Sequence, residues 1–296
     1  MSKLEIKRLG AIDIGSNAIR CLITSVAKND NDVKYKKLTL VRVPIRLGED
    51  VFTNDEISEK KKIRLINAMQ SYSFLFKAFE VDNYRACATS AMREASNGKA
   101  IIDKIKQQSG ISVDIISGSE EAKIIFDAGI SSFLDNDKSY LYVDVGGGST
   151  ELTVFSEHKI VASKSFKVGT VRLLHHKAPS NEWDKMRLWL GTNVSNKKIE
   201  CLIGSGGNIN KLVKLAPSLE KEKCIEKKDL KLLFADLNEL TYEERIEKYG
   251  MNPDRADVII PAAKIFLTIL RWTKTDYIFA PKFGLADGII HLLDEY

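Results

Sequence analysis

The sequence predicts an α/β protein made of two similar domains, and two observations carry this prediction. The stretch "AIDIGSNAIRCLI" (11–23) is matched later in the chain by "YVDVGGGSTELTV" (142–154). Each stretch reads as two alternating apolar strands joined by a glycine-containing turn, which is typical of a β-hairpin. In both halves, a third strand and then alternating helices and strands follow the hairpin. The repeated order indicates two α/β domains.

In the first half, periodicity predicts three strands after the hairpin and three helices between and after them. The strands are expected at 35–45, 84–90 and 113–117, and the helices at 55–79, 97–108 and 120–133. The first domain is therefore placed at 1–133. A final helix at 285–296 is expected to pack back on it.

In the second half, the same reasoning predicts strands at 159–166, 198–206 and 277–281. Helices are expected at 181–193 and 208–215, with further helix continuing to about 273. The second domain is placed at 136–284. The polar stretch "LDNDKS" (134–139) is the predicted boundary, because it separates two periodic segments.

Composition fits an ordinary globular protein. The chain has 296 residues, of which 44% are hydrophobic and 29% charged, and a net charge of +5. This small excess tilts the surface toward anionic partners but is also common on solvated surfaces. The four cysteines form no C-x-x-C pair, so reduced thiols and a cytoplasmic location are expected instead of a zinc site. Neither a signal peptide nor a membrane span is expected.

The second hairpin places two acids on either side of its turn. If the turn centres between Gly147 and Gly148, Asp144 and Glu151 face each other across the two strands. Opposed like charges destabilise a sheet, so a cation is expected between them. Mg²⁺ commonly takes one or two carboxylates and completes its shell with water and phosphate oxygens. The glycines would then let backbone N–H groups approach a phosphate.

The first hairpin differs in charge. The same register opposes Asp13 to Arg20, an acid to a base, so the two halves are similar but not equivalent. A purely structural interpretation is available for either hairpin alone, since glycine, aspartate and serine are common turn residues. Because two such hairpins occur at corresponding places of a repeat, a functional role for them is favoured over a purely structural one.

Nine segments follow, in order and over essentially the whole chain, the motifs of a known family. They are "AIDIGSNAIR", "RLGEDVF", "ACATSAMREASN", "IISGSEEAKIIF", "YVDVGGGSTEL", "VGTVRLL", "IGSGGNIN", "DRADVIIPAAKI" and "GLADGII". The sequence thus resembles the exopolyphosphatase/guanosine pentaphosphate phosphohydrolase (Ppx/GppA) family. That resemblance implies two RNase H-like domains of the actin-like ATPase superfamily, with an active-site cleft between them. It also implies a phosphoanhydride hydrolase of the stringent response.

The resemblance also implies roles for individual residues. Glu121 would be the general base that activates water, and Arg93 would bind phosphate. Asp144 and Glu151 would be the acids associated with Mg²⁺ or another divalent cation. Phosphate would further contact two turns, whose residues are Asp13, Gly15, Ser16, Asn17 and Arg20 in the first and Gly146, Gly147, Gly148 and Ser149 in the second. A structural alternative for Glu121 is that it, like Glu120, stabilises a helix start after Ser117.

Some features depart from the family pattern or leave alternatives open. Ala18 stands where a serine is common, and this chain is expected to be a short form without the helical domains of longer members, including an HD-type domain. The expected partner is polyphosphate or a guanosine polyphosphate. DNA, RNA and membranes are not expected as partners, and a homodimer is left open. A phosphotransferase and a non-catalytic sensor are the competing functions.

Overall fold

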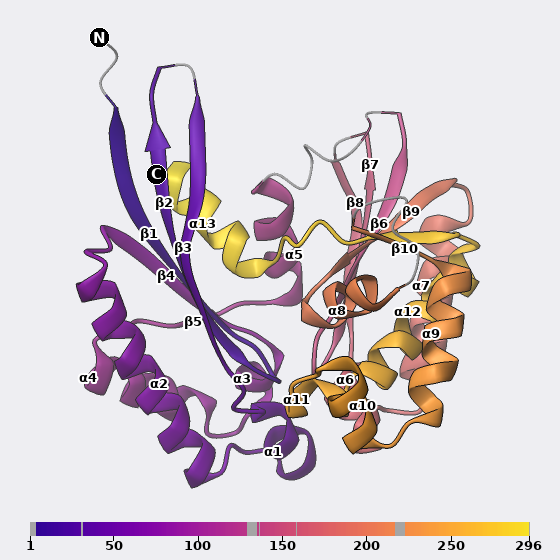
Figure 1. The fold of residues 1–296 in the computed structure, drawn as a ribbon, viewed down its shortest axis with the longest axis horizontal. Helices are drawn as coiled ribbons and strands as arrows, with labels where there is room; N and C mark the ends of the chain where they lie inside the picture. The colour runs from indigo at the N-terminus through magenta and orange to yellow at the C-terminus, as the bar shows by residue number, and fades with distance from the viewer. Residues whose placement is uncertain are drawn as a thin grey trace. The chain divides into compact units, whose positions relative to one another are not determined.

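The computed structural model describes residues 4–30, 32–128, 135, 137–157, 159–216 and 223–295 (Figure 1). The chain divides into two compact units. Unit 1 comprises Met1–Ile130 together with Leu285–Tyr296, and unit 2 comprises Ser131–Gly284. The boundary stretch predicted at 134–139 lies partly outside the described residues, as does the end of the helix predicted at 120–133. Each unit is described by itself below.

Unit 1 is built on a mixed sheet of five strands in the order β3-β2-β1-β4-β5. The strands are β1 (Glu5–Ile14), β2 (Ile19–Lys28), β3 (Val33–Val43), β4 (Asn83–Ala88) and β5 (Asp114–Ile115). The first three are antiparallel, and β4 runs parallel to β1 and to β5. The helices are α1 (Leu47–Asn54), α2 (Glu59–Ala78), α3 (Ser90–Glu94), α4 (Gly98–Ser109), α5 (Gly118–Asp127) and α13 (Leu285–Glu295).

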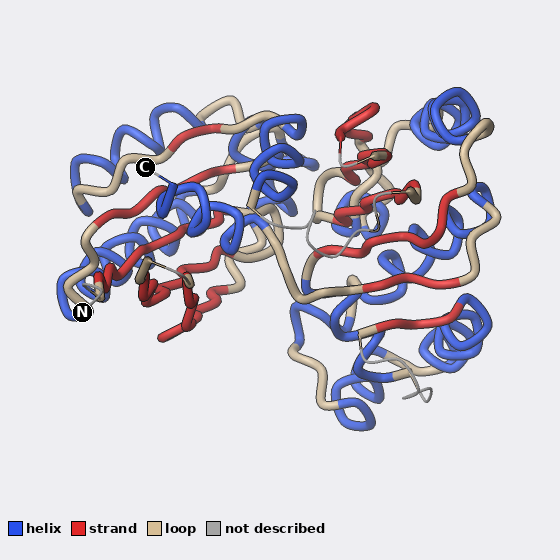
Figure 2. Tube along the Cα trace, turned by 90° about the horizontal axis from the view of Figure 1, so that it is seen from above, coloured by secondary structure: helices blue, strands red, loops and turns tan. Residues whose placement is uncertain are grey.

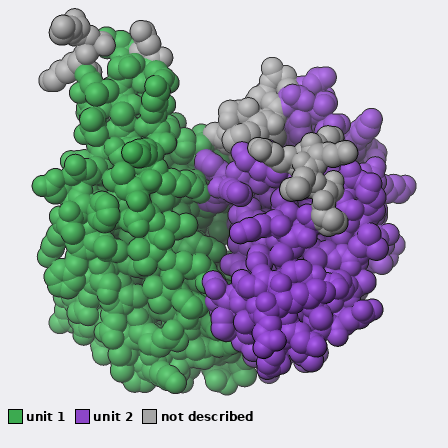
Figure 3. All heavy atoms as spheres, in the orientation of Figure 1, with its two compact units in different colours: residues 1–130, 285–296 green, residues 131–284 purple. Residues whose placement is uncertain are grey.

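Helices cover both faces of this sheet (Figure 2). On one face, Gly10 of β1 leaves room for the ring of Phe76 on α2, whose Cε1 would lie 2.7 Å from any Cβ at that position. On the other face, α13 packs against β1, β2 and α5. In α13, His291 stacks on Tyr35 of β3 with ring centroids 4.1 Å apart, and Asp287 pairs with Lys37 at 2.5 Å. The end of the described chain is thus fixed to unit 1 (Figure 3).

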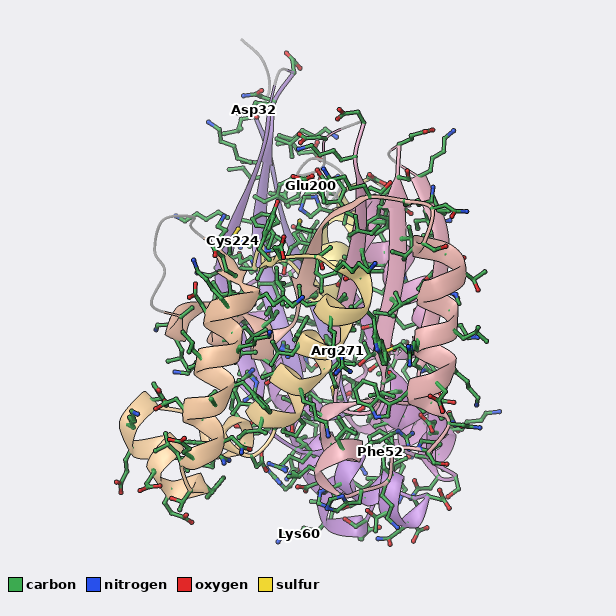
Figure 4. The ribbon with its side chains drawn as sticks, turned by 90° about the vertical axis from the view of Figure 1, so that its right-hand side faces the viewer. Asp32, Phe52, Lys60, Glu200, Cys224 and Arg271 are labelled. Atoms are coloured by element: carbon green, nitrogen blue, oxygen red, sulfur yellow. The ribbon has the colours of Figure 1, made fainter. Side chains whose placement is uncertain are left out.

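Unit 2 repeats this plan with one more strand, in the order β10-β11-β9-β6-β7-β8. The strands are β6 (Ser139–Val145), β7 (Thr150–Ser156), β8 (Lys159–Phe166), β9 (Ile199–Ser205), β10 (Cys224–Glu226) and β11 (Tyr277–Phe279). The helices are α6 (Thr170–Leu174), α7 (Glu182–Val194), α8 (Gly207–Leu215), α9 (Lys227–Glu239), α10 (Tyr242–Tyr249), α11 (Pro253–Ala256) and α12 (Ile259–Thr273). Cys224 and Arg271, labelled in Figure 4, mark β10 and α12.

The two sheets correspond strand by strand. Read from their antiparallel edges, β3-β2-β1-β4-β5 matches β8-β7-β6-β9-β11, and β10 is the extra strand. The predicted α/β repeat is therefore confirmed. Both predicted hairpin registers are also confirmed, because Asp13 pairs with Arg20 and Asp144 pairs with Glu151.

The structure differs from the sequence-based prediction around the first helix. The helix expected at 55–79 is confirmed as α2, although it begins at Glu59, after Ser58. The preceding helix α1 was not predicted, and it ends before Asp55, which adopts a left-handed conformation with φ 61°. The Ser58 hydroxyl accepts a hydrogen bond from the Lys61 N–H, which caps the new helix. Arg46 lies directly before α1.

Two predictions made from composition can be compared with the described residues. None of the helices described is both long and apolar enough to cross a bilayer. All four cysteines are free thiols, and Cys21, Cys87 and Cys201 are buried. Burial raises the pKa of each of these three thiols to about 12, which keeps them protonated.

Candidate active site

The turn between β6 and β7 is tied to the helix α6 that follows β8. Gly146 N–H donates to the Ser149 carbonyl at 2.9 Å, which closes the turn. The carbonyl groups of Gly146 and Gly147 in this turn accept hydrogen bonds from N–H groups in the first turn of α6. Thr170 N–H donates to Gly146 O at 3.0 Å, and Val171 N–H donates to Gly147 O at 2.9 Å. These donors have no partner inside a helix, so the turn satisfies them.

This arrangement fixes the direction of the peptide groups in the turn. The side chain of Arg172 adds a bond from its Nε to Gly148 O at 2.8 Å, so three successive carbonyls are directed toward α6. No peptide bond of the described residues is cis. In a planar trans peptide the C=O and the following N–H point in opposite directions. The N–H groups of Gly147, Gly148 and Ser149 therefore point away from α6, as the donors of an anion site would.

The two acids of this hairpin lie beside the turn. Asp144 on β6 is half-buried and faces Glu151 on β7, which is 5% exposed. Glu151 Oε1 accepts hydrogen bonds from the hydroxyls of Ser149 at 2.5 Å and Ser165 at 2.9 Å. The Ser149 hydroxyl, expected to assist phosphate binding, is thus directed at the acid. These bonds fix the orientation of the Glu151 carboxylate.

The donor set fits a magnesium ion. Among the described residues, no group of three or more His, Cys, Asp or Glu side chains is placed to hold a metal. Two carboxylates are nevertheless a common protein contribution to a Mg²⁺ shell, the remainder being water and phosphate oxygens. Asp144 and Glu151 present two carboxylates from adjacent strands, which are the residues that could hold such an ion. Hydroxyl groups that orient Glu151 are the kind of supporting contact that metal ligands receive.

The end of β9 lies beside Asp144, on the side away from Glu151. Ser205 is its partner on the parallel strand β9, and Gly206 follows with φ 94°. A Cβ at Gly206 would lie 3.4 Å from Asp144 Oδ1, in a backbone conformation that other residues rarely adopt. Next to it, Arg255 Nη1 donates to Asn208 Oδ1 at 2.9 Å. Arg255 belongs to the segment "DRADVIIPAAKI".

The corresponding turn in unit 1 is held in a similar way. Gly15 N–H donates to Ala18 O at 3.2 Å, and the carbonyls of Ser16 and Asn17 accept from N–H groups at the start of α1. Those donors are Gly48 N at 2.8 Å and Arg46 N at 3.0 Å. The Ser16 hydroxyl lies 2.8 Å from that of Ser90, at the start of α3. In contrast to the acid pair of unit 2, Asp13 Oδ2 accepts from Arg20 Nη1 at 2.6 Å.

The two glutamates that begin α5 have different surroundings. Ser117 caps the helix by accepting from the Glu120 N–H at 3.1 Å, as the capping alternative predicts. The Glu120 carboxylate, however, accepts from Arg85 Nη2 of β4 at 2.9 Å. Glu120 thus has a structural partner in the sheet. Glu121 is half-buried one residue further into the first turn.

Arg93 is connected to the same region of unit 1. Its side chain, in the last turn of α3, donates from Nη1 to Ile116 O at 2.7 Å. Ile116 directly precedes the Ser117 cap of α5, so the structure brings Arg93 and the Glu121 helix start together. The acid pair and the glycine turn are likewise brought together in unit 2. Sequence reasoning missed Arg172, although "VGTVRLL" was among the motifs that it quoted.

Comparison with known proteins gives a consistent picture. Residues 25–294 match the sequence model of the Ppx/GppA phosphatase family. A bifunctional 3-dehydroquinate synthase/phosphatase of Fusobacterium nucleatum is 31% identical over 90% of this chain, which spans 44% of that relative's length. Exopolyphosphatase 1 of Mycobacterium leprae is 21% identical, over 96% of this chain and 88% of its own.

A solved structure gives the same fold. An exopolyphosphatase from Cytophaga hutchinsonii superposes with a TM-score of 0.82 and 26% identity, covering 98% of both chains. The predicted fold class, an α/β protein with two similar domains, is confirmed by this likeness and by the matched strand orders.

Proposed function

Because the chain belongs to the Ppx/GppA phosphatase family, we propose that it releases the terminal phosphate of inorganic polyphosphate by attack of water on a phosphoanhydride bond. The main support for this proposal is the arrangement of the glycine turn and the two acids in unit 2. Three N–H groups of the glycine turn point to one side, and the two opposed acids Asp144 and Glu151 lie beside that turn. Phosphoryl transfer needs positioning and charge neutralisation more than covalent help from the protein.

In unit 2, the residues of the glycine turn and the two acids bind the terminal phosphate and neutralise its charge. The N–H groups of Gly147, Gly148 and Ser149 donate to oxygens of the terminal phosphate. Asp144 and Glu151 hold Mg²⁺, which when bound neutralises negative charge on the phosphate oxygens. Glu151 is kept in place by the hydroxyls of Ser149 and Ser165. Without a cation, the two acids would repel an anionic substrate as well as each other.

In unit 1, Glu121 acts as the general base. Its carboxylate takes a proton from water, the water oxygen forms a bond to the terminal phosphorus, and the bridging P–O bond breaks. The products are inorganic phosphate and a chain shorter by one unit. Arg93 donates to phosphate oxygens. Its hydrogen bond to Ile116 O keeps it close to the start of the Glu121 helix.

Guanosine pentaphosphate is a second substrate of the same chemistry. Its terminal phosphate is also joined through a phosphoanhydride bond, so the same groups suffice to hydrolyse it. Three basic residues, Lys211 and Lys214 of α8 and Arg255 of α11, interact near the end of β9. There, burial and then the charges of Lys214 and Arg255 lower the pKa of Lys211, as expected where cations crowd together.

One assay separates the possible functions. The protein is incubated with polyphosphate or guanosine pentaphosphate and Mg²⁺, with and without ADP, and free phosphate and ATP are measured. A hydrolase releases phosphate without ADP and loses activity with EDTA. ATP formation that requires ADP would indicate a phosphotransferase instead. Binding without either product would indicate a sensor and would refute the proposal.

A further inference from the structure

We propose that Arg172 is a positioning residue that fixes the glycine turn of unit 2 in its phosphate-binding conformation. The inference rests on the proposed function, because that function assigns the terminal phosphate to the N–H groups of this turn. It concerns a residue to which neither the sequence motifs nor the chemistry above had given a role. The evidence is a set of hydrogen bonds around one buried guanidinium.

Arg172 is almost completely buried, with 6% of its surface exposed. Its Nε donates to Gly148 O at 2.8 Å, and its own backbone N–H lies 3.2 Å from Gly147 O. Burying a guanidinium is unfavourable unless its donors are satisfied. One satisfied donor is directed at the peptide group between Gly148 and Ser149. The side chain therefore acts on the last of the three peptides whose N–H groups point away from α6.

The composition of the turn explains why such a contact is needed. Three consecutive glycines have no side chains that restrict the backbone. Their peptide groups can therefore adopt many conformations at similar energy. Any freedom retained by the peptides must be lost when phosphate binds, which lowers affinity. The backbone N–H groups of Thr170 and Val171 hold the first two carbonyls. Arg172 is the residue whose side chain holds the third.

Gly169 allows this close approach. A Cβ at this position would lie 2.4 Å from Gly147 O and from Gly148 C, which are backbone atoms that cannot move aside easily. Its φ of −131° is open to any residue, so the requirement is for space. The sequence "VGTVR" thus provides a small residue for contact, three backbone donors and one side-chain donor. These parts together restrict the turn to a single arrangement.

The test compares Arg172→Gln and Arg172→Lys with the wild type. Neither variant can place a donor where Nε lies with the same geometry, and the lysine keeps the positive charge. The first readout is amide hydrogen exchange of Gly147, Gly148 and Ser149. The second is the Kd for inorganic phosphate with Mg²⁺, and the third is the KM and kcat for polyphosphate. Arg187→Gln, at an exposed position of α7, is the matched control.

We expect faster exchange of the turn amides in both Arg172 variants and a roughly 10- to 100-fold weaker Kd for phosphate, the range for loss of a hydrogen bond to a charged group. The lysine variant should be affected less, and the control should match the wild type. Added guanidinium should partly restore phosphate binding to Arg172→Gln. A lower Tm with unchanged exchange and Kd would overturn the inference, because Arg172 would then only stabilise the fold.

The outcome is distinguishable from failure of the proposed function. If the wild-type protein hydrolyses neither substrate, the proposed function fails. The exchange rates of the turn amides still decide whether Arg172 fixes the turn. If Arg172→Gln does not fold, the lysine variant supplies the same three measurements. Unchanged exchange in a folded Arg172→Lys protein that binds phosphate normally would refute the inference.

Discussion

The two hairpin turns have similar backbone hydrogen bonds, but the charged residues beside them differ. Each is closed by a hydrogen bond from its first residue to its fourth, and each has carbonyls held by N–H groups at the start of the helix after the third strand. In unit 1, Asp13 is neutralised by Arg20 on the adjacent strand. In unit 2, the corresponding positions carry Asp144 and Glu151. The repeat thus preserves geometry, and single side chains decide what each turn can bind.

This difference divides the proposed chemistry between the units. The turn of unit 1 has a balanced pair of charges and does not require a cation. The turn of unit 2 has two acids together, and under the proposed function a bound cation would stabilise it and contribute charge to phosphate binding. The general base assigned to unit 1, Glu121, is on a helix, α5, and not in its hairpin. Three experiments test this division, and a fourth tests the packing of the C-terminal helix in unit 1.

The largest effect is expected at Glu121. Glu121→Gln retains size and hydrogen bonding but cannot take a proton, so kcat should fall by about 10²–10⁴-fold, the usual contribution of a general base. Binding of Mg²⁺ and phosphate should persist, because Glu121 is assigned neither as a metal ligand nor as a phosphate contact. Rates of phosphate release at saturating polyphosphate measure this.

Glu120→Gln is the matched control, since its carboxylate bonds Arg85 and it lies one residue away. Its kcat should change little, with at most a modest loss of stability. A near wild-type rate for Glu121→Gln together with an inactive Glu120→Gln would mean that the bases are reversed. If neither change matters, unit 1 does not supply the base.

A smaller loss is expected from the acids of unit 2. Asp144→Asn and Glu151→Gln each remove a proposed ligand and relieve like-charge repulsion, so the Mg²⁺ concentration for half-maximal activity should rise by roughly 10²-fold while the protein stays folded. Titration of activity with Mg²⁺ and a thermal melt of each variant measure the two effects. Normal titrations in both variants would contradict the bridging cation.

The same change in unit 1 should have a different result. Asp13→Asn breaks the ion pair with Arg20, whose side chain is 31% exposed, and should lower the free energy of unfolding by about 1–2 kcal/mol. The dependence of activity on Mg²⁺ should not change. Urea denaturation gives the first quantity and metal titration the second. A shifted metal titration would show that the two turns are not divided as we propose.

The smallest effect concerns pH and the C-terminal helix of unit 1. Burial lowers the pKa of His291, partly opposed by Asp287, Asp294 and Glu295 and reinforced by Lys37. The unfolded chain therefore binds this proton more readily, so stability is full above about pH 6.5 and falls as the pH drops toward the lowered pKa. His291→Gln should flatten this part of a plot of stability against pH. An unchanged slope would show that another group titrates there.

The sequence predicted those features that depend on short-range pattern. Alternating apolar residues and the glycine turns fixed both hairpin registers, including the pairs of Asp13 with Arg20 and Asp144 with Glu151. Contacts between distant segments could not be predicted in this way. The bond from Arg172 to Gly148 depends on how α6 approaches the turn, and α1 is a short helix that begins after a left-handed residue, Arg46.

Unit 1 is composed of two stretches that are separated in the chain by the whole of unit 2. During synthesis, domains generally fold in the order in which they leave the ribosome. All of unit 2 is translated before α13, so unit 2 can fold while the sheet of unit 1 still lacks the helix that covers β1 and β2. The apolar face of that sheet is then exposed to chaperones and to aggregation in the nascent chain. Synthesis of "LADGIIHLLDE" supplies the helix that covers β1 and β2.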